Sequence, residues 1–325
     1  MTDRLARIAG IGSYLPDRIL SNDDLAAMVD TSDSWIRERT GIRQRHIAPD
    51  GVTTADLAEQ ACRRALDDAG LTAEDVDLIV VATTTPDFTF PSVGTILQAR
   101  LGATKGAAFD VQAVCTGFVY ALSVADNMIA RGQAETALVV GAETMSRILD
   151  WTDRSTCVLF GDGAGAMVLT AGEAAGTDGA DGILATYLRS DGRFKDLLHV
   201  DGGPSSTGTV GHLRMVGNQV FRHAVTNIAE SMTTIAGRAG VSIEEVDWFV
   251  PHQANQRILE GVARKLSIPT EKVISTVADH GNTSAASVPL AFDRAVQDGR
   301  IKRGDLVLME ALGGGFTWGA ALARF

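Results

Sequence analysis

Two related stretches of the sequence decide the fold: AGLTAEDVDLIVVATTT at residues 69–85 and AGVSIEEVDWFVPHQAN at residues 239–255. The offset between them is 239 − 69 = 170, and in both a helix end, a capping turn, a Val-Asp pair and an apolar strand follow in the same order. Two further strands, beginning at Ala137 and Leu306, repeat at an offset of 169. A fixed period favours an internal duplication of about half the chain. The alternative is chance similarity between helix–turn–strand units.

Short β-branched runs alternate with longer helical stretches along the chain, which is typical of an α/β fold. The predicted strands are Leu78–Ala82, Ala137–Gly141, Met167–Leu169, Trp248–Val250, Leu306–Met309 and Ala320–Ala323. The predicted helices are Thr54–Ala69, Thr116–Arg131, Asn218–Ala239, Gln253–Leu266 and Ser284–Asp298. Gly70 follows the first of these helices as a C-terminal cap.

The helix that begins at Thr116 is apolar nearly all round and carries one charge, Asp126. Such a helix is buried on all sides, and the duplication gives it a partner in residues 282–299. Two buried helices between two sheets predict a layered α-β-α-β-α architecture. Residues 171–182, AGEAAGTDGADG, are small and acidic, and we expect them to link two halves at residues 1–172 and 173–325.

Composition limits the classes of function. The 325 residues carry 29 Lys+Arg and 40 Asp+Glu, so the net charge is 29 − 40 = −11, which argues against nucleic acid and acidic membrane surfaces as partners. The three cysteines are widely spaced without a CxxC pair, which argues against a disulfide framework or zinc knuckle and fits a reducing compartment. We expect a cytoplasmic protein with no signal peptide, membrane span or bound metal.

Cys115 follows the run FDVQAV and opens the buried helix. A thiol at a helix N-terminus faces free N–H groups and the positive end of the helix dipole, which lower its pKa and favour the thiolate. The alternative is that a lone cysteine is a small buried hydrophobe. Cys62 and Cys157 lie in apolar settings that fit this alternative.

Two polar segments of the second half offer partners for a nucleophile. His252 follows a predicted strand, with Gln253 and Asn255 beside it; a lone histidine is more often a satisfied loop residue. The offset 282 − 115 = 167 predicts that Asn282 occupies the place that Cys115 holds in the first half. A thiolate with His and Asn as neutral donors suits acyl transfer through a thioester.

The glycine-rich stretches indicate close backbone approach rather than nucleotide binding. FGDGAGA at residues 160–166 precedes a predicted strand instead of joining a strand to a helix, which disfavours a dinucleotide loop. ALGGGFTWG at residues 311–319 lacks the Lys-Ser/Thr ending of a phosphate loop. Its three glycines leave a backbone N–H free to face an oxyanion.

Seven segments together resemble the β-ketoacyl-acyl-carrier-protein synthase III family of the thiolase superfamily. They are GSYLP, TSDSWIRERTGI, DVQAVCTGF, FGDGAGA, VPHQANQRI, HGNTSAASVP and GGGFTWG, which run in order from about Gly10 to Phe325. The resemblance implies a thiolase-like, internally duplicated five-layer fold and a homodimer. It also implies that acetyl-CoA, a substrate rather than a cofactor, acylates the cysteine. Malonyl-acyl carrier protein then condenses with loss of CO₂, which initiates type II fatty-acid synthesis.

The resemblance also assigns roles to individual residues. Cys115 would be the nucleophile, and His252 and Asn282 would donate hydrogen bonds to the malonyl thioester carbonyl. The N–H groups of Cys115 and Gly314 would form the oxyanion hole. The residues implied for CoA binding are Trp35, Arg39, Arg154, Gly217 and Asn255. Those implied for carrier-protein docking are Arg222, Arg257, Arg264 and Lys265, and those for the acyl pocket are Phe90 and Leu312.

The pattern Cys–His–Asn separates the initiating enzymes from their relatives. Thiolases use a second cysteine, and chain-elongating synthases carry a second histidine where this chain has Asn282. Leu312, Ser155 and Thr116 depart from residues common in the family, which bears on the acyl pocket. The rival hypotheses are a paralogue that takes longer or branched primers in secondary metabolism, and a non-catalytic carrier-protein-binding module.

Overall fold

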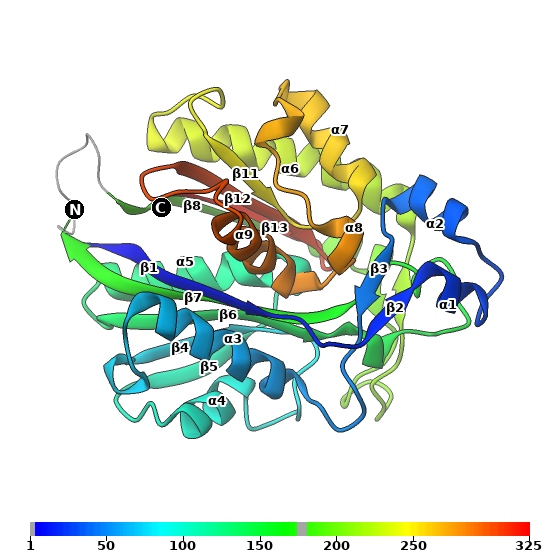
Figure 1. Cartoon of the computed structure of the whole chain (residues 1–325), viewed down its shortest axis with the longest axis horizontal. Helices are drawn as coiled ribbons and strands as arrows, with labels where there is room; N and C mark the ends of the chain where they lie inside the picture. The colour runs from blue at the N-terminus through cyan, green and yellow to red at the C-terminus, as the bar shows by residue number, and fades with distance from the viewer. Residues whose placement is uncertain (1–3, 174–180) are drawn as a thin grey trace.

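Two β-sheets form the framework of the protein (Figure 1). The computed structural model describes residues 4–173 and 181–325. The first sheet, in spatial order, consists of β1 (Arg4–Tyr14), β7 (Asp162–Glu173), β6 (Thr136–Thr144), β4 (Leu78–Ala82) and β5 (Ala107–Val111). The second consists of β11 (Trp248–Pro251), β12 (Leu306–Gly313), β13 (Thr317–Arg324) and β8 (Gly182–Ser190). The short pairs are β2 (Ile19–Ser21) with β3 (Gln44–His46) and β9 (Leu198–Val200) with β10 (Leu213–Met215).

Helices lie outside and between the two sheets, so the layers follow the predicted order α-β-α-β-α (Figure 1). The helices α3 (Thr54–Ala69) and α4 (Val93–Leu101) cover the outer face of the first sheet. The central layer holds α5 (Gly117–Ala130) and α9 (Ser287–Gln297), and α6 (Gly217–Ala239) with α7 (Gln256–Leu266) lies over the second sheet. Three short helices, α1 (Asn22–Ala26), α2 (Asp33–Thr40) and α8 (Val277–His280), lie near the β2–β3 hairpin.

The central layer is apolar because it contacts a sheet on each side. Side chains of α5 such as Phe118 and Leu122 pack with Val288 and Phe292 of α9 in one buried cluster. Asp126 is the charged residue of α5, and burial raises the pKa of its carboxyl to about 6. The predicted α5 and α9 are thus confirmed as buried helices.

The duplication is visible in an unusual backbone turn before each central helix. Val114 and Ser284 have φ values of +51° and +49°, which non-glycine residues adopt rarely. Each opens a 3₁₀ turn, Val114–Thr116 and Ser284–Ala286, and leads directly into α5 or α9. The structural offset is therefore 284 − 114 = 170. The prediction that Asn282 matches Cys115 is wrong by three residues, because Asn282 precedes the strained turn whereas Cys115 lies inside it.

The structure contains elements that the sequence pattern did not predict, among them the sheet strands β1, β5 and β8. They lie at the edges of the sheets, where a mixed polar and apolar sequence is tolerated. The FGDGAGA stretch lies largely inside β7 rather than before a strand. The predicted link is shorter than residues 171–182, since β7 continues to Glu173 and β8 begins at Gly182. Its middle, residues 174–180, lies outside the described residues.

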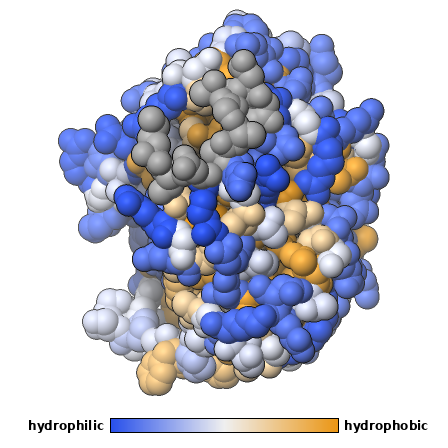
Figure 2. Space-filling model, turned by 90° about the vertical axis from the view of Figure 1, so that its left-hand side faces the viewer, coloured by the Kyte–Doolittle hydropathy of each residue, from blue (hydrophilic) through white to orange (hydrophobic). Residues whose placement is uncertain are grey.

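The first sheet draws its strands from residues before 174 and the second from residues after 181. The division at residues 172 and 173 stays a prediction. On the face shown in Figure 2, polar side chains cover most of the surface, with hydrophobic ones between them near its middle. In the described part of the chain, no helix has the length and apolar character needed to span a bilayer.

Candidate active site

Cys115, His252 and Asn282 line one cavity of about 90 Å³ between the two halves. Cys115 comes from the turn before α5, His252 follows β11, and Asn282 precedes the turn before α9. Each of the three side chains is almost completely buried. Apolar walls come from β9, β10 and α6 and include Leu198, Met215 and Phe221. The structure therefore brings together the three residues that the sequence singled out, from segments far apart in the chain.

The turn that carries Cys115 is held against the β12–β13 hairpin. The Thr317 hydroxyl donates to the carbonyl oxygen of Ala113 at 2.8 Å, and the Thr116 hydroxyl donates to that of Thr317 at 2.9 Å. A Cβ atom added to Gly313 would lie 2.6 Å from the Cys115 nitrogen, so only glycine allows this approach. The hairpin thus fixes the strained backbone around Cys115. Sequence reasoning missed Gly313, although the run of three glycines signalled a close contact.

The thiol of Cys115 lies in an apolar enclosure that opposes ionisation. Burial raises its pKa to about 12, because removal from water disfavours the charged form. The expectation that the helix N-terminus lowers this pKa is therefore wrong for the free protein. Desolvation of the sulfur is the largest cause of this shift, and a thiol with this pKa is protonated at neutral pH.

The raised pKa predicts the pH dependence of alkylation. Iodoacetamide should modify Cys115 slowly at pH 7, with a rate that rises about tenfold per pH unit up to about pH 9, since the thiolate fraction does so below the pKa. Mass spectrometry measures the rate, and the variant Cys115→Ser reports the background from Cys62 and Cys157. A rate that levels off near pH 7 would show a preformed thiolate and contradict this result.

His252 is a neutral imidazole in this enclosure. Burial lowers its pKa to about 3, so the ring is uncharged at pH 7. Its Nδ1 lies 2.6 Å from the Ser287 hydroxyl, and its backbone N–H donates to the carbonyl oxygen of Glu310 at 2.8 Å. A neutral ring can donate one hydrogen bond without being a strong base.

The side chain of Gln253, the polar neighbour of His252, has a structural role. Its side-chain NH₂ donates to the carbonyl oxygens of Pro251 and Ile274. Its side-chain oxygen accepts from the N–H groups of Thr276 and Val277. Gln253 therefore ties the end of β11 to the segment before α8 and fixes the backbone that carries His252.

The amide of Asn282 is oriented by its own backbone. Its Oδ1 accepts from the N–H of Ser284 at 2.9 Å. The Asn282 N–H and C=O pair with Leu159 and Gly161, which anchors the residue to the segment before β7. Since the oxygen is engaged, the NH₂ group is the part of the amide left to act as a donor in the cavity.

Acidic groups near this site are also deeply buried. Burial raises the pKa of Glu310 to about 8, so this carboxyl is protonated at neutral pH. Burial also raises the pKa of Glu143, whose oxygens accept hydrogen bonds from Thr84 and Thr85. The cavity therefore presents a thiol, a neutral imidazole and an amide. This set can accept an acyl group and stabilise a developing negative charge without a strong general base.

The residues predicted for CoA lie in two places. Gly217 and Asn255 line the cavity, and Asn255 also caps α7 by accepting from the N–H of Ile258. Trp35 lies on α2, with the guanidinium carbons of Arg39 and Arg154 at 4.8 and 5.1 Å from its ring centre. A nucleobase stacked between Trp35 and Arg154 needs about 7 Å between the plane of the indole ring and the plane of the guanidinium group. The half-exposed Arg154 must therefore move for a base to enter.

The residues predicted for carrier-protein docking are all exposed, with Arg222 on α6 and the other three on α7. Arg264 lies 3.9 Å from Glu260. For Arg222, Arg257 and Lys265 the described part of the chain supplies no ion-pair partner. We call these four residues the basic mouth. It provides local positive charge on a chain whose net charge is −11.

The two residues predicted for the acyl pocket differ in position. Leu312 lines the cavity, whereas Phe90 is 83% exposed and does not. Phe88 is also exposed. The assignment of Phe90 to the acyl pocket stays a prediction.

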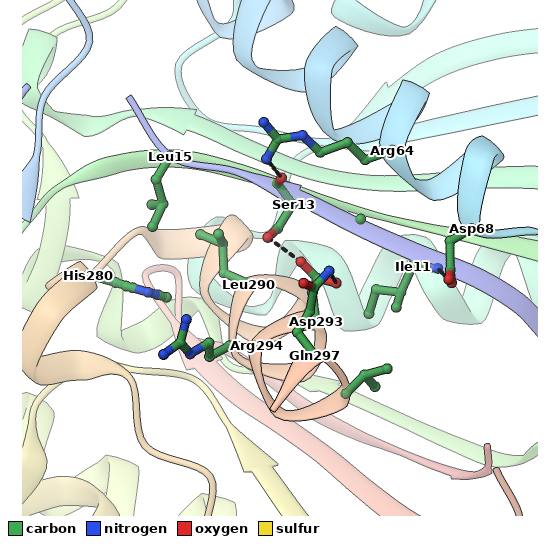
Figure 3. A pocket seen from close by; sticks show the side chains of 12 residues that line it. Ile11, Ser13, Leu15, Arg64, Asp68, His280, Leu290, Asp293, Arg294 and Gln297 are labelled. Atoms are coloured by element: carbon green, nitrogen blue, oxygen red, sulfur yellow. Dashed lines mark hydrogen bonds between the residues drawn. The ribbon is translucent and has the colours of Figure 1, made fainter. Parts of the chain in front are cut away.

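A larger cavity of about 460 Å³ lies between β1, α3 and α9. Figure 3 shows that several of its polar groups are partners of one another: Ser13 donates to Asp293, Arg64 donates to the carbonyl oxygen of Ser13, and Asp68 accepts from the N–H of Ile11. None of the three predicted catalytic side chains lines it. Size alone therefore does not identify the candidate site.

Comparisons with known proteins agree with this geometry. A family model described as 3-oxoacyl-[acyl-carrier-protein (ACP)] synthase III matches residues 109–192, and its C-terminal counterpart matches residues 237–325. The chain is 64% identical over 317 residues to beta-ketoacyl-[acyl-carrier-protein] synthase III of Caulobacter vibrioides, with 98% of each chain covered.

Solved structures give the same result. The 3-oxoacyl-[acyl-carrier-protein] synthase III from Aquifex aeolicus superposes with a TM-score of 0.92 at 48% identity, covering 98% of this chain and 100% of that one. The priming beta-ketosynthase of the R1128 polyketide pathway has a TM-score of 0.93 at 36% identity, with 99% and 96% covered.

Proposed function

Since the chain belongs to the 3-oxoacyl-[acyl-carrier-protein] synthase III family, we propose that it joins the acetyl group of acetyl-CoA to malonyl-acyl carrier protein. The chain is an acyltransferase, and its five layers are the thiolase-like fold predicted from the sequence. The products are CoA, CO₂ and 3-oxobutanoyl-acyl carrier protein, and the reaction initiates type II fatty-acid synthesis.

The first half-reaction transfers the acetyl group to Cys115. The sulfur attacks the thioester carbonyl of acetyl-CoA, and the N–H groups of Cys115 and Gly314 stabilise the oxyanion. The carbon–sulfur bond to CoA breaks, and the proton of the Cys115 thiol ends on the CoA thiol. The approach of Gly313 to the Cys115 nitrogen supports this geometry, because it brings the glycine run next to the nucleophile.

The second half-reaction forms the carbon–carbon bond. Loss of CO₂ from the malonyl group leaves an enolate, whose oxygen accepts hydrogen bonds from His252 and Asn282. The enolate carbon attacks the acetyl carbonyl, the carbon–sulfur bond to Cys115 breaks, and the released thiolate takes a proton from water. Decarboxylation itself generates the carbanion, so no base is required. The neutral state of His252 and the oriented amide of Asn282 support this division of roles.

The observation that carries the proposal is the convergence of a buried cysteine with two neutral donors in one small cavity. A cavity of about 90 Å³ is small for a ligand site, which supports a short primer. When the protein is incubated with acyl-CoA thioesters of two to eight carbons, intact-protein mass spectrometry should show that the acetyl group is added fastest. Preference for the eight-carbon primer would contradict the acetyl assignment.

We also propose a homodimer, located in the cytoplasm. The strand β5 lies at the edge of the first sheet and pairs only with β4 in the described structure. An unpaired strand edge, together with the exposed aromatic side chains Phe88 and Phe90, supports an interface between two chains. The chemistry requires a reduced Cys115, which supports the cytoplasm. Light scattering should give twice the mass of one chain; the mass of one chain would contradict the dimer.

The basic mouth predicts a separable effect on the carrier protein. Arg257→Glu should lower kcat/KM for malonyl-acyl carrier protein about tenfold while acetyl transfer from CoA stays within about twofold, because the exposed charge meets only the acidic partner. The difference between wild type and variant should shrink as salt is added. Arg294→Glu, which makes the same charge change beside the larger cavity, is the control. Equal loss of both activities in Arg257→Glu would contradict a docking role.

A further inference from the structure

Ser287 lies at the start of α9 and contacts His252, whose neutral ring can carry its proton on either of two nitrogens. It is the first residue of the helix and is fully buried. Its hydroxyl oxygen lies 2.6 Å from Nδ1 of His252 and 3.3 Å from the backbone nitrogen of Gln253. Neutral histidine carries one ring proton, either on Nδ1 or on Nε2, and the two forms differ in which nitrogen donates.

The donors and acceptors around the Ser287 hydroxyl determine which group donates in its hydrogen bond with His252. The Gln253 N–H can only donate, so it occupies a lone pair of the Ser287 oxygen. The hydroxyl has one proton, and throughout residues 4–173 and 181–325 its acceptor within hydrogen-bond distance is Nδ1 of His252. A proton on Nδ1 would leave the buried Ser287 hydroxyl without an acceptor, which is unfavourable.

We propose that Ser287 is a positioning residue that holds the ring proton of His252 on Nε2. This assignment rests on the proposed function and explains how His252 acts as a donor. With Nδ1 turned to Ser287, Nε2 is the nitrogen left for the cavity. The N–H at Nε2 and the NH₂ of Asn282 then provide two donors for one thioester oxygen.

The same assignment separates the two half-reactions. An Nε2 that already carries a proton cannot take the proton of the Cys115 thiol. His252 therefore contributes to decarboxylation and condensation, and acetylation of Cys115 proceeds without it. The N-terminus of α9 also favours the neutral ring of His252, because the positive end of the helix dipole disfavours a charged imidazole nearby. The low pKa of His252 agrees with a ring that stays neutral through the cycle.

The test is a direct measurement of the His252 tautomer in the full chain. Nitrogen-15 NMR of histidine-labelled protein distinguishes protonated from unprotonated ring nitrogens, and the spectrum of His252→Ala identifies the His252 signals. The wild type should show a protonated Nε2 and an unprotonated Nδ1. Ser287→Ala should give a mixture with protonated Nδ1. Ser287→Thr retains the hydroxyl and should restore the wild-type pattern.

Kinetics provide the second readout. Ser287→Ala should lower decarboxylative condensation about 10- to 100-fold, whereas acetylation of Cys115 stays within about twofold. Ser231→Ala removes another fully buried helical hydroxyl, which donates to the carbonyl oxygen of Ile228, and should change neither rate.

A protonated Nδ1 in the wild type, or an unchanged tautomer in Ser287→Ala, would overturn the proposal. The tautomer is measured without substrates. A chain that showed the Nε2 form but no condensation would contradict the proposed function and leave the role of Ser287 supported. The wild-type spectrum alone decides the assignment if Ser287→Ala fails to fold.

Discussion

Replacing Cys115 by serine should abolish acetylation of the protein and lower condensation at least about 1,000-fold. A serine hydroxyl ionises far less readily than a thiol, and among the described residues that line the cavity no base is positioned to remove its proton. His252 offers its protonated nitrogen to the cavity, and Asn282 offers an amide NH₂. Nothing else among the described cavity-lining residues can activate a hydroxyl.

The measurement is the intact mass after incubation with acetyl-CoA. Wild type should gain one acetyl group on Cys115, and Cys115→Ser should gain none. Cys157→Ser is the matched control, because Cys157 is also a fully buried thiol but lies outside the cavity. Cys157→Ser should acetylate like wild type. Acetylation of Cys115→Ser at the wild-type rate would show that another residue is the nucleophile.

His252→Ala and Asn282→Ala should separate the two half-reactions. Each removes one hydrogen-bond donor to the enolate, and the loss of one such donor costs about 100- to 1,000-fold in rate. Acetylation of Cys115 should stay within a few fold, because neither residue takes the thiol proton. The condensation rate of the double variant should fall by less than the product of the two single effects, since both donors act on one oxygen.

The measurements are the acetyl mass on the protein and CO₂ release from malonyl-acyl carrier protein, on the same samples. His280→Ala is the control for His252→Ala, because His280 is a half-buried imidazole whose pKa is also lowered, to about 4, but it lines the larger cavity. His280→Ala should retain both activities. Loss of acetylation in His252→Ala would mean that His252 acts as the base for Cys115.

The repeated elements were predictable because their signals are local. α3 and β4 match the predicted residues at both ends, since Gly70 adopts the left-handed conformation of a helix cap and the strand is a continuous apolar run. Cys115, His252 and Asn282 were also identified, and each follows or precedes a predicted element. Edge strands such as β1 and β5 carry mixed sequences and gave no comparable signal.

Features that depend on packing were not predictable from local pattern. The pKa of Cys115 depends on how completely the second half encloses the thiol, which no spacing in the sequence reveals. Gln253 is polar and next to His252 in the sequence, yet the hydrogen bonds of its side chain are all to backbone groups. Ser287 is one of several small residues in SAASVP, and its contact with His252 depends on how the start of α9 packs against the residue that follows β11.

In the proposed reaction, Cys115 carries the acetyl group that is joined to the malonyl unit. Protein acetylated with labelled acetyl-CoA is freed of excess CoA thioester and mixed with malonyl-acyl carrier protein, and both proteins are followed by mass spectrometry. The label should leave Cys115 and appear in 3-oxobutanoyl-acyl carrier protein, with one CO₂ released for each acetyl group. A label that remains on Cys115 while the carrier protein keeps its malonyl group would show that the acetyl group on Cys115 is not the one that is condensed.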